Sequence, residues 1–156
     1  MPTMTEAKLA IVDTLKANSV VATEFTTANI DYGEPRNLNL ETVVKRINVV
    51  SIGRVEEQQT VLSGRRSTAR YDFDVVASFL ESDPKSASDR WERYEAMMKD
   101  ALESNPFLLR GGVKHANIGI SFPRSLVVNN PQVDSLYHVV VSLEARHSLV
   151  ASSRAV

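Results

Sequence analysis

The sequence of 156 residues contains no cysteine, which excludes a disulfide framework and any metal site built from thiolates. No apolar run approaches the ~20 residues of a membrane-spanning helix, and the start, MPTMTEAKLA, lacks the basic and apolar parts of a signal peptide. The net charge of -1 excludes the simplest basis for nucleic-acid binding, a strongly basic domain. We therefore expect one soluble domain over residues 1–156 that folds by packing alone and is made in the cytoplasm.

Sequence signatures of catalysis are also missing, since GxSxG, P-loop and HExxH motifs do not occur. His115, His138 and His147 have no ligand spacing, and we interpret them as ordinary solvated or partly buried histidines. Asp72 and Asp74 could bind a metal or share acid–base chemistry. However, a half-exposed strand already requires polar residues at those positions. The sequence therefore predicts a protein that is not an enzyme and has no cofactor and no metal ligand.

The N-terminal segment predicts an amphipathic helix. Thr3 and Glu6 have the spacing of a capping box, and the helical pattern ends near Asn18. The apolar stripe of this helix consists of Ala7, Ile11 and Leu15. Beyond it the pattern weakens: residues 20–25 could form a strand, whereas residues 29–40 contain glycine and proline and predict a loop.

Two segments in the middle of the chain predict paired strands. Residues 43–52 are rich in β-branched side chains, and residues 71–79 alternate between apolar and mostly polar positions. The apolar positions are Tyr71, Phe73, Val75, Ala77 and Phe79. Residues 53–66 between the strands are too polar for the core and too long for a tight turn. They predict a long projecting hairpin tip, which is either a functional contact or simply mobile.

Residues 83–106 predict the strongest helix, with Ser86 near its start and Pro106 as its stop. Its apolar stripe consists of Ala87, Trp91, Tyr94, Met98, Ala101 and Leu102. Gly111 and Gly112 come after this helix and before another strand pattern. A phosphate-binding loop has the reverse order, with the strand before the glycines and the helix after them. We therefore interpret Pro106 and the two glycines as a structural corner that needs a positive φ.

The C-terminal part predicts two further strands, at residues 116–122 and 136–148, followed by a frayed tail at residues 149–156. The combined pattern predicts an α+β fold. We expect a mainly antiparallel β-sheet with a long projecting hairpin, packed against two α-helices.

Charge is distributed unevenly along the chain. Residues 43–70 contain six basic and two acidic residues, whereas residues 71–104 contain nine acidic and four basic ones. The two segments could meet between neighbouring copies in a head-to-tail contact that closes a ring. Alternatively, both are solvated surfaces. The candidate contact residues are Arg54, Glu56, Glu57, Arg65, Arg66, Asp89 and Glu92.

Residues 4–148 resemble the tail-terminator proteins of long-tailed bacteriophages. The resemblance lies in the succession of an N-terminal helix, a strand RYDFDVVASF, a helix with WERYEAMMKDAL, the corner SNPFLLRGGV and a final strand LYHVVVSLEA. It implies a structural protein of the virion neck that forms a hexameric ring. The ring would cap the completed tail tube, stop its polymerisation and join the head connector.

The same resemblance implies a set of partners. These are further copies of the chain, the tail tube protein, head–tail connector or neck proteins and, in contractile tails, the sheath protein. DNA would only pass through the lumen, and the tip at residues 54–66 would contact tube or connector. Three alternatives stay open: another neck or connector ring, a small binding module that uses its sheet surface, and an enzyme centred on Asp72, Asp74 and a histidine.

Overall fold

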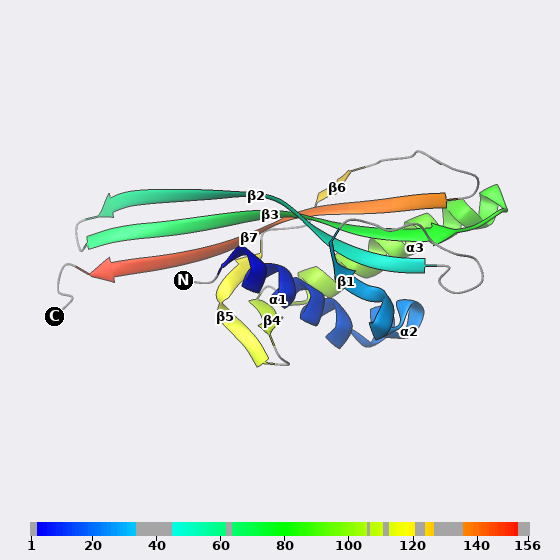
Figure 1. Ribbon diagram of the computed structural model, residues 1–156, viewed down its shortest axis with the longest axis horizontal. Coiled ribbons are helices and arrows are strands. Elements are labelled where there is room, and N and C mark those ends of the chain that lie inside the picture. Colours follow the sequence, from blue (N-terminus) through cyan, green and yellow to red (C-terminus); the bar gives the residue numbers. More distant parts are fainter. Residues whose placement is uncertain are drawn as a thin grey trace.

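Within the residues that the structure describes, seven strands form a mainly antiparallel sheet with helices on one face, so the predicted α+β class is confirmed (Figure 1). The computed structural model describes residues 3–33, 45–61, 64–105, 107–110, 113–120, 124–126 and 136–152. The elements are α1 (Met4–Ala17), α2 (Ser19–Phe25), β1 (Ile30–Tyr32), β2 (Lys45–Val61), β3 (Gly64–Leu80), α3 (Pro84–Glu103), β4 (Phe107–Arg110), β5 (Val113–Ile120), β6 (Arg124–Leu126) and β7 (Leu136–Ser152). The strand order is β1-β2-β3-β7-β5-β4, with β6 also paired to β7. None of the described helices is both long and apolar enough to cross a membrane.

Helix α1 forms as its sequence predicts. The Thr3 hydroxyl accepts a hydrogen bond from the Glu6 backbone N–H at 3.1 Å, which satisfies one of the free donors at the helix start. The predicted stripe of Ala7, Ile11 and Leu15 is fully buried. Helix α1 contacts β4 on one side and β1 and β2 on the other. The local sequence pattern was therefore sufficient to place this helix.

Helix α2 occupies residues 20–25, for which a strand was the expectation, and that expectation is wrong. Asn18 starts the helix, because its Oδ1 accepts hydrogen bonds from the backbone N–H groups of Val20 and Val21, both at 3.1 Å. Val21 and Phe25 lie one turn apart and are both fully buried. β-Branched residues weaken a helix in isolation, but here the cap and this buried pair outweigh that preference.

The segment predicted as a loop begins with the short strand β1. Ile30 is buried and pairs in parallel with Ile47 of β2. Gly33 ends the strand with a φ of 105°, and its N–H donates to the Val49 carbonyl at 3.0 Å. The rest of the predicted loop, residues 34–40, lies outside the described residues. A strand of three residues has too little alternation for sequence reasoning to detect.

Strands β2 and β3 are each 17 residues long and pair antiparallel up to Val61, whose partner is Gly64. The segment 53–66, predicted as a polar tip, is therefore strand apart from residues 62 and 63, which lie outside the described residues. Backbone pairing explains the difference, because a ladder of hydrogen bonds does not require an apolar side chain at every second position.

A β-bulge interrupts β2 near its middle. Ser51 pairs with Phe73 and Gly53 pairs with Asp72, so Ile52 is an extra residue, and its side chain is 58% exposed. A bulge of one residue changes which face of the sheet the following positions occupy. The alternation of β2 before Ile52 therefore cannot be extended to the residues after it.

Strand β7 pairs with β3 along its whole length, from Leu136 to Ser152, which pairs with Gly64. The part of the sheet beyond the helices therefore has three strands, and the expected two-stranded projecting hairpin is not confirmed (Figure 1). Of the predicted frayed tail, residues 149–152 belong to β7, and residues 153–156 lie outside the described residues. We refer to β2, β3 and β7 beyond the helices as the sheet extension, comprising residues 53–61, 64–72 and 144–152.

Helix α3 is the second helix that the sequence predicted. It begins at the predicted place, because the Asp83 carboxylate accepts hydrogen bonds from the Ser86 backbone N–H at 3.4 Å and from the Ser86 hydroxyl at 2.8 Å. Pro84 occupies its first turn, where its missing N–H is not needed. The predicted stripe is confirmed: Trp91 is partly buried, and the fully or almost fully buried members are Ala87, Tyr94, Met98, Ala101 and Leu102.

The glycine pair lies between two strands and not at the end of a helix. Strands β4 and β5 are antiparallel, and Arg110 at the end of β4 pairs with Val113 at the start of β5. Gly111 and Gly112 separate these partners, although they and Pro106 lie outside the described residues. Strand β4 therefore separates the glycine pair from the end of α3. The predicted corner at Pro106, Gly111 and Gly112 stays a prediction, since these residues are not among those described.

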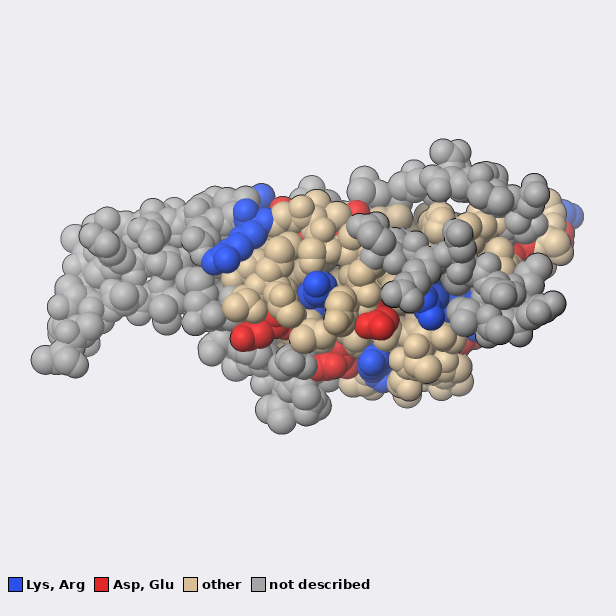
Figure 2. Space-filling model, viewed as in Figure 1, with Lys and Arg blue, Asp and Glu red and all other residues tan. Residues whose placement is uncertain are grey.

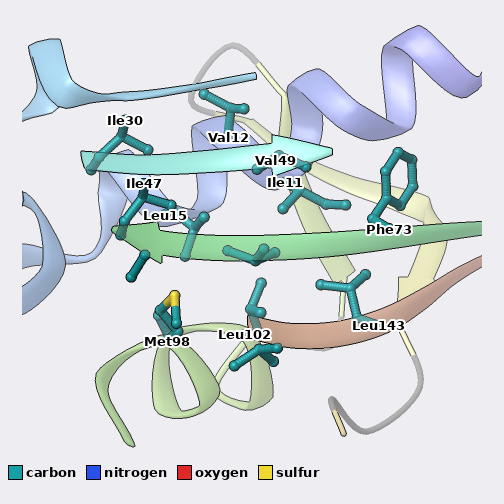
Figure 3. Close-up of a cluster of buried hydrophobic side chains, with 14 of the residues drawn as sticks. Ile11, Val12, Leu15, Ile30, Ile47, Val49, Phe73, Met98, Leu102 and Leu143 are labelled. Carbon is teal, nitrogen blue, oxygen red and sulfur yellow. The ribbon is translucent and has the colours of Figure 1, made fainter. Parts of the chain in front are cut away.

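Figure 3 shows the centre of the core, where side chains from α1, the sheet and α3 meet. Ile11 and Leu15 of α1 pack beside Val49 and Ile47 of β2, and Met98 of α3 lies below them. All five side chains are fully buried. Full burial of an apolar side chain of this size stabilises the fold by ~1.5–3 kcal/mol. This core fixes the helices on one face of the sheet and reaches the start of the sheet extension through Ala69, Tyr71 and Ala145, which are also fully buried.

Candidate assembly surface

Four of the predicted contact residues lie in the sheet extension: Glu56 and Glu57 in β2, and Arg65 and Arg66 in β3. Their backbone belongs to a continuous antiparallel ladder. The extension reaches past the N-terminal end of α1 (Figure 1). A partner that contacts these residues would therefore meet a sheet and its edge, and not the loop that the sequence predicted.

Arg54 also lies in this extension, but its side chain is engaged within the chain. Its guanidinium carbon lies 5.6 Å from the centre of the Tyr71 ring, and Tyr71 is fully buried. A cation over an aromatic ring contributes about 0.5–1 kcal/mol at an exposed site. The bulge at Ile52 makes this contact possible, because uninterrupted alternation from Val49 would place Arg54 on the opposite face of the sheet.

The remaining two predicted contact residues, Asp89 and Glu92, are exposed on α3. This helix follows the end of β3 that is farthest from Arg65 (Figure 1). A strand of 17 residues spans about 55 Å at ~3.3 Å per residue. Asp89 and Glu92 therefore lie near the opposite end of the molecule from Arg65 and Arg66. Contact between them requires two copies, and it stays a prediction.

A charged network that the sequence analysis missed joins α2, β2 and α3. Glu24 Oε1 accepts hydrogen bonds from Lys45 Nζ at 2.9 Å and from the Tyr94 hydroxyl at 2.8 Å. Arg93 Nη2 donates to the same oxygen at 3.2 Å. Glu24 and Tyr94 are 70 positions apart in the sequence. No local pattern could have indicated that these residues meet.

The pKa of Glu24 reflects this network. Burial alone would raise its pKa, but hydrogen bonds from Lys45 and Tyr94, together with the charges of Lys45 and Arg93, outweigh burial and lower the pKa below its ordinary value. Glu24 therefore stays ionised in the folded protein and attracts side chains from two neighbouring elements. The network holds α2 and α3 together at the end of the molecule opposite the sheet extension.

Arg90 connects the same network to the end of β3. Its Nη1 donates to the Leu80 carbonyl at 3.2 Å and to Glu81 Oε2 at 3.0 Å. Its Nε and Nη2 donate to the Tyr94 hydroxyl at 3.0 and 2.8 Å. The guanidinium carbon also lies 4.9 Å from the centre of the Phe79 ring. Arg90 thus fixes the direction in which α3 leaves β3.

An open groove of about 510 Å³ lies beside this network, between α2 and α3. Its lining consists of Ser19, Val20, Thr23, Glu24, Arg93 and Met97. Val20 is 59% exposed, and the side chain of Arg93 is 57% exposed. Apolar contact area beside an exposed guanidinium is typical of a protein–protein contact.

The carboxylates considered for metal binding or acid–base chemistry make local contacts. Asp74 Oδ1 accepts a hydrogen bond from the Ser142 hydroxyl at 2.6 Å. Asp72 Oδ1 lies 3.3 Å from Arg70 Nε. Both residues are half-buried on the face of the sheet opposite the core. These contacts match the interpretation that they form the polar side of a half-exposed strand.

His138 does not meet those carboxylates. Its Nδ1 lies 2.7 Å from the Ser78 hydroxyl, and Ser78 is four positions from Asp74 along β3, which corresponds to about 13 Å. Burial lowers the pKa of His138 and favours the neutral ring, whose Nδ1 can accept a hydrogen bond from the Ser78 hydroxyl. The side chains of His115 and His147 lie outside those described. Among the described residues, no three His, Cys, Asp or Glu side chains come together to hold a metal.

Charged side chains of both signs are interspersed on the face of the molecule that Figure 2 shows. The described part of this face has no extended area of a single sign. Elsewhere on the described surface, opposite charges pair, as in Arg146 with Glu144 at 2.9 Å. A surface that binds a phosphate backbone would instead gather lysine and arginine in one area. This distribution suits local contacts with other proteins.

The described residues define a class of fold: an α+β chain whose three longest strands extend beyond its helices. This fold is similar to that of a solved chain from the virion of a native gene transfer agent particle, with a TM-score of 0.50 and 14% sequence identity. The similarity covers 93% of this chain and 96% of that chain. No protein-family model and no curated protein matches the sequence. At this identity the comparison shows a shared fold over nearly the whole length of both chains.

Proposed function

We propose that the protein is a structural component of a phage-like virion, and that it forms a hexameric ring that caps the completed tail tube. The observation that carries this proposal is the similarity to a virion chain over 93% of this chain and 96% of the other. A match over both lengths supports a likeness of the whole fold and not only of a shared submotif. The resemblance of residues 4–148 to tail-terminator proteins supports the finer assignment.

The shape of the chain fits a protein that joins two different structures. The sheet extension lies at one end, and α2 and α3 lie toward the other (Figure 1). Residues of these two helices line the groove. A terminator must cover the end of the tube with one surface, so that no further subunit adds, and offer another surface to the head connector. Two chemically different ends on one chain meet that requirement.

The charge of the chain fits a ring through which DNA moves. A ring of nearly neutral subunits, with a net charge of -1 each, has little electrostatic affinity for the phosphate backbone. DNA can then pass without being retained. The partners on this proposal are the tail tube protein, connector or neck proteins and, in contractile tails, the sheath protein. The site of action is the neck of the virion.

The proposal is tested by sedimentation followed by binding to tail tubes that lack a terminator. We expect a species of six 17.3 kDa chains, about 104 kDa for a closed ring, either in free solution or on the tube end. Binding to the connector without binding to the tube would instead assign the chain to another neck or connector ring. A monomer that binds neither would contradict the proposal and favour a small binding module.

A further inference from the structure

Within the part of the chain that the structure describes, the sheet extension has two edges with no further strand paired to them. Among the described residues, the outer side of β2 is paired only at residues 47–49, by β1. The outer side of β7 is paired at residues 140–142 by β6 and at residues 145–146 by β5. Residues 55–61 of β2 and 147–152 of β7 therefore have a described partner strand on the β3 side alone. An edge strand presents backbone donors and acceptors to a further strand.

The edge of β2 has the regularity that a further strand requires. Its one irregularity is the bulge between Ser51 and Gly53, and the register with β3 is continuous from Gly53 to Val61. The sequence of this segment contains no proline, which is a common means of blocking an edge. One large apolar residue lies directly before this segment, because Ile52 is 58% exposed. A strand that pairs here would also cover apolar surface.

We propose that the occupant of the β2 edge is the β7 edge of a second copy of this chain. The two edges lie on opposite sides of β3, so the same contact can repeat from one copy to the next. Each copy then uses β2 toward one neighbour and β7 toward the other. This inference rests on the ring proposed above and names the strand segments, residues 55–61 and 147–152, that hold its subunits together.

Strand direction separates this arrangement from a simple dimer. β2 and β7 are both antiparallel to β3 and therefore run in the same direction. A neighbour related by rotation about an axis along the strands brings its β7 beside β2 in parallel orientation. Two copies paired through β2 alone would be antiparallel, and both β7 edges would stay open. Only the repeating contact uses both edges of every copy.

Cysteine cross-linking tests this pairing cleanly, because the chain has no cysteine of its own. Gln58 of β2 and Leu149 of β7 both pair with Ser67 of β3, so within one chain β3 separates them. Their Cα atoms are then about 9.6 Å apart, beyond the ~7 Å limit for a disulfide. Any disulfide between Gln58→Cys and a cysteine in β7 must therefore join two copies.

Gln58→Cys is combined in turn with a single cysteine at each position from 147 to 151, which samples the possible registers between copies. After oxidation, at least one combination should give a ladder of covalent oligomers that ends at the size of the closed ring. The ladder should collapse to monomer on reduction. The matched control carries Ser67→Cys in the central strand as its sole cysteine. It should give no cross-link between copies, because β3 is paired on both sides.

The outcomes separate the pairing from the ring itself. A hexamer in native mass measurements, without cross-links in any combination, would overturn the edge pairing and leave the ring formed by another surface. Disulfide dimers from Gln58→Cys alone would show β2 pairing with itself and also overturn the inference. Failure to find any oligomer, in solution or on tail tubes, would overturn both the pairing and the proposed function.

Discussion

Replacement of Tyr94 by phenylalanine tests whether the charged network holds α2 and α3 in place. The Tyr94 hydroxyl donates to Glu24 Oε1 at 2.8 Å and accepts from Arg90 Nε and Nη2 at 3.0 and 2.8 Å. The ring centre lies 4.8 Å from that of Phe25 and 5.2 Å from that of Phe79. Phenylalanine keeps these ring contacts. The variant therefore removes one oxygen atom from a fully buried side chain and little else.

The expected loss follows from the partners that remain. Hydrogen bonds to charged groups contribute ~1.5–3 kcal/mol each to stability. Arg90 keeps its bond to Glu81, and Glu24 keeps its bond to Lys45. The Glu24 side chain is 26% exposed, so water replaces part of what is lost. We expect the free energy of unfolding to fall by about 2 kcal/mol and the melting temperature by ~4–8 °C.

Thermal and urea unfolding, followed by circular dichroism, measure this change. Tyr137→Phe is the matched control, because its ring stacks on Phe79 at 5.4 Å and its hydroxyl has no hydrogen bond to the described residues. This control should change the free energy of unfolding by less than ~0.5 kcal/mol. If Tyr94→Phe is as stable as the control, the network contributes nothing and the reasoning is refuted.

Three further predictions address other parts of the chain. The lowered pKa of Glu24 gives stability that is present above the ordinary value of about 4.5 and lost as the pH falls through the folded-state pKa. In urea unfolding, the difference between Glu24→Gln and the unmodified chain should therefore shrink below that pH, and a constant difference would contradict the assignment. Asn18→Ala should lower the free energy of unfolding by about 1 kcal/mol through loss of the α2 cap, whereas Asn18→Asp, which keeps the acceptor, should not. Arg65→Glu with Arg66→Glu should weaken assembly if these residues meet an acidic neighbour, and unchanged sedimentation at moderate salt would exclude that contact.

The elements that the sequence predicted well are those in which a local pattern and tertiary burial agree. Thr3 caps α1 as its spacing with Glu6 indicated, and the stripe that includes Tyr94 is the buried face of α3. Along β3, the five predicted apolar positions from Tyr71 to Phe79 are all buried, although Val76 and Ser78 on the other face are buried too. In each case the side chains that decide the structure lie within a few positions of one another.

The elements that were missed depend on partners far away in the sequence. Strand β1 exists because Ile30 can pair with Ile47, and residues 149–152 are strand because β3 offers them an edge. The network around Glu24 combines residues from three elements. Most of the candidate contact residues lie in the polar segment 53–66, which the sequence predicted to be a hairpin tip. The described part of that segment is instead strand. A polar composition says little about a ladder that backbone groups form.

The central position of β3 has a consequence for the order in which the protein is made. Its partner β2 precedes it directly, whereas His138 of β7 follows Ser78 by 60 residues. At ~5–20 residues per second, a ribosome takes roughly 3–12 s to add those residues. During that interval one edge of β3, with apolar alternation from Tyr71 to Phe79, has no strand to pair with. A nascent chain in this state is the form of the protein most exposed to aggregation.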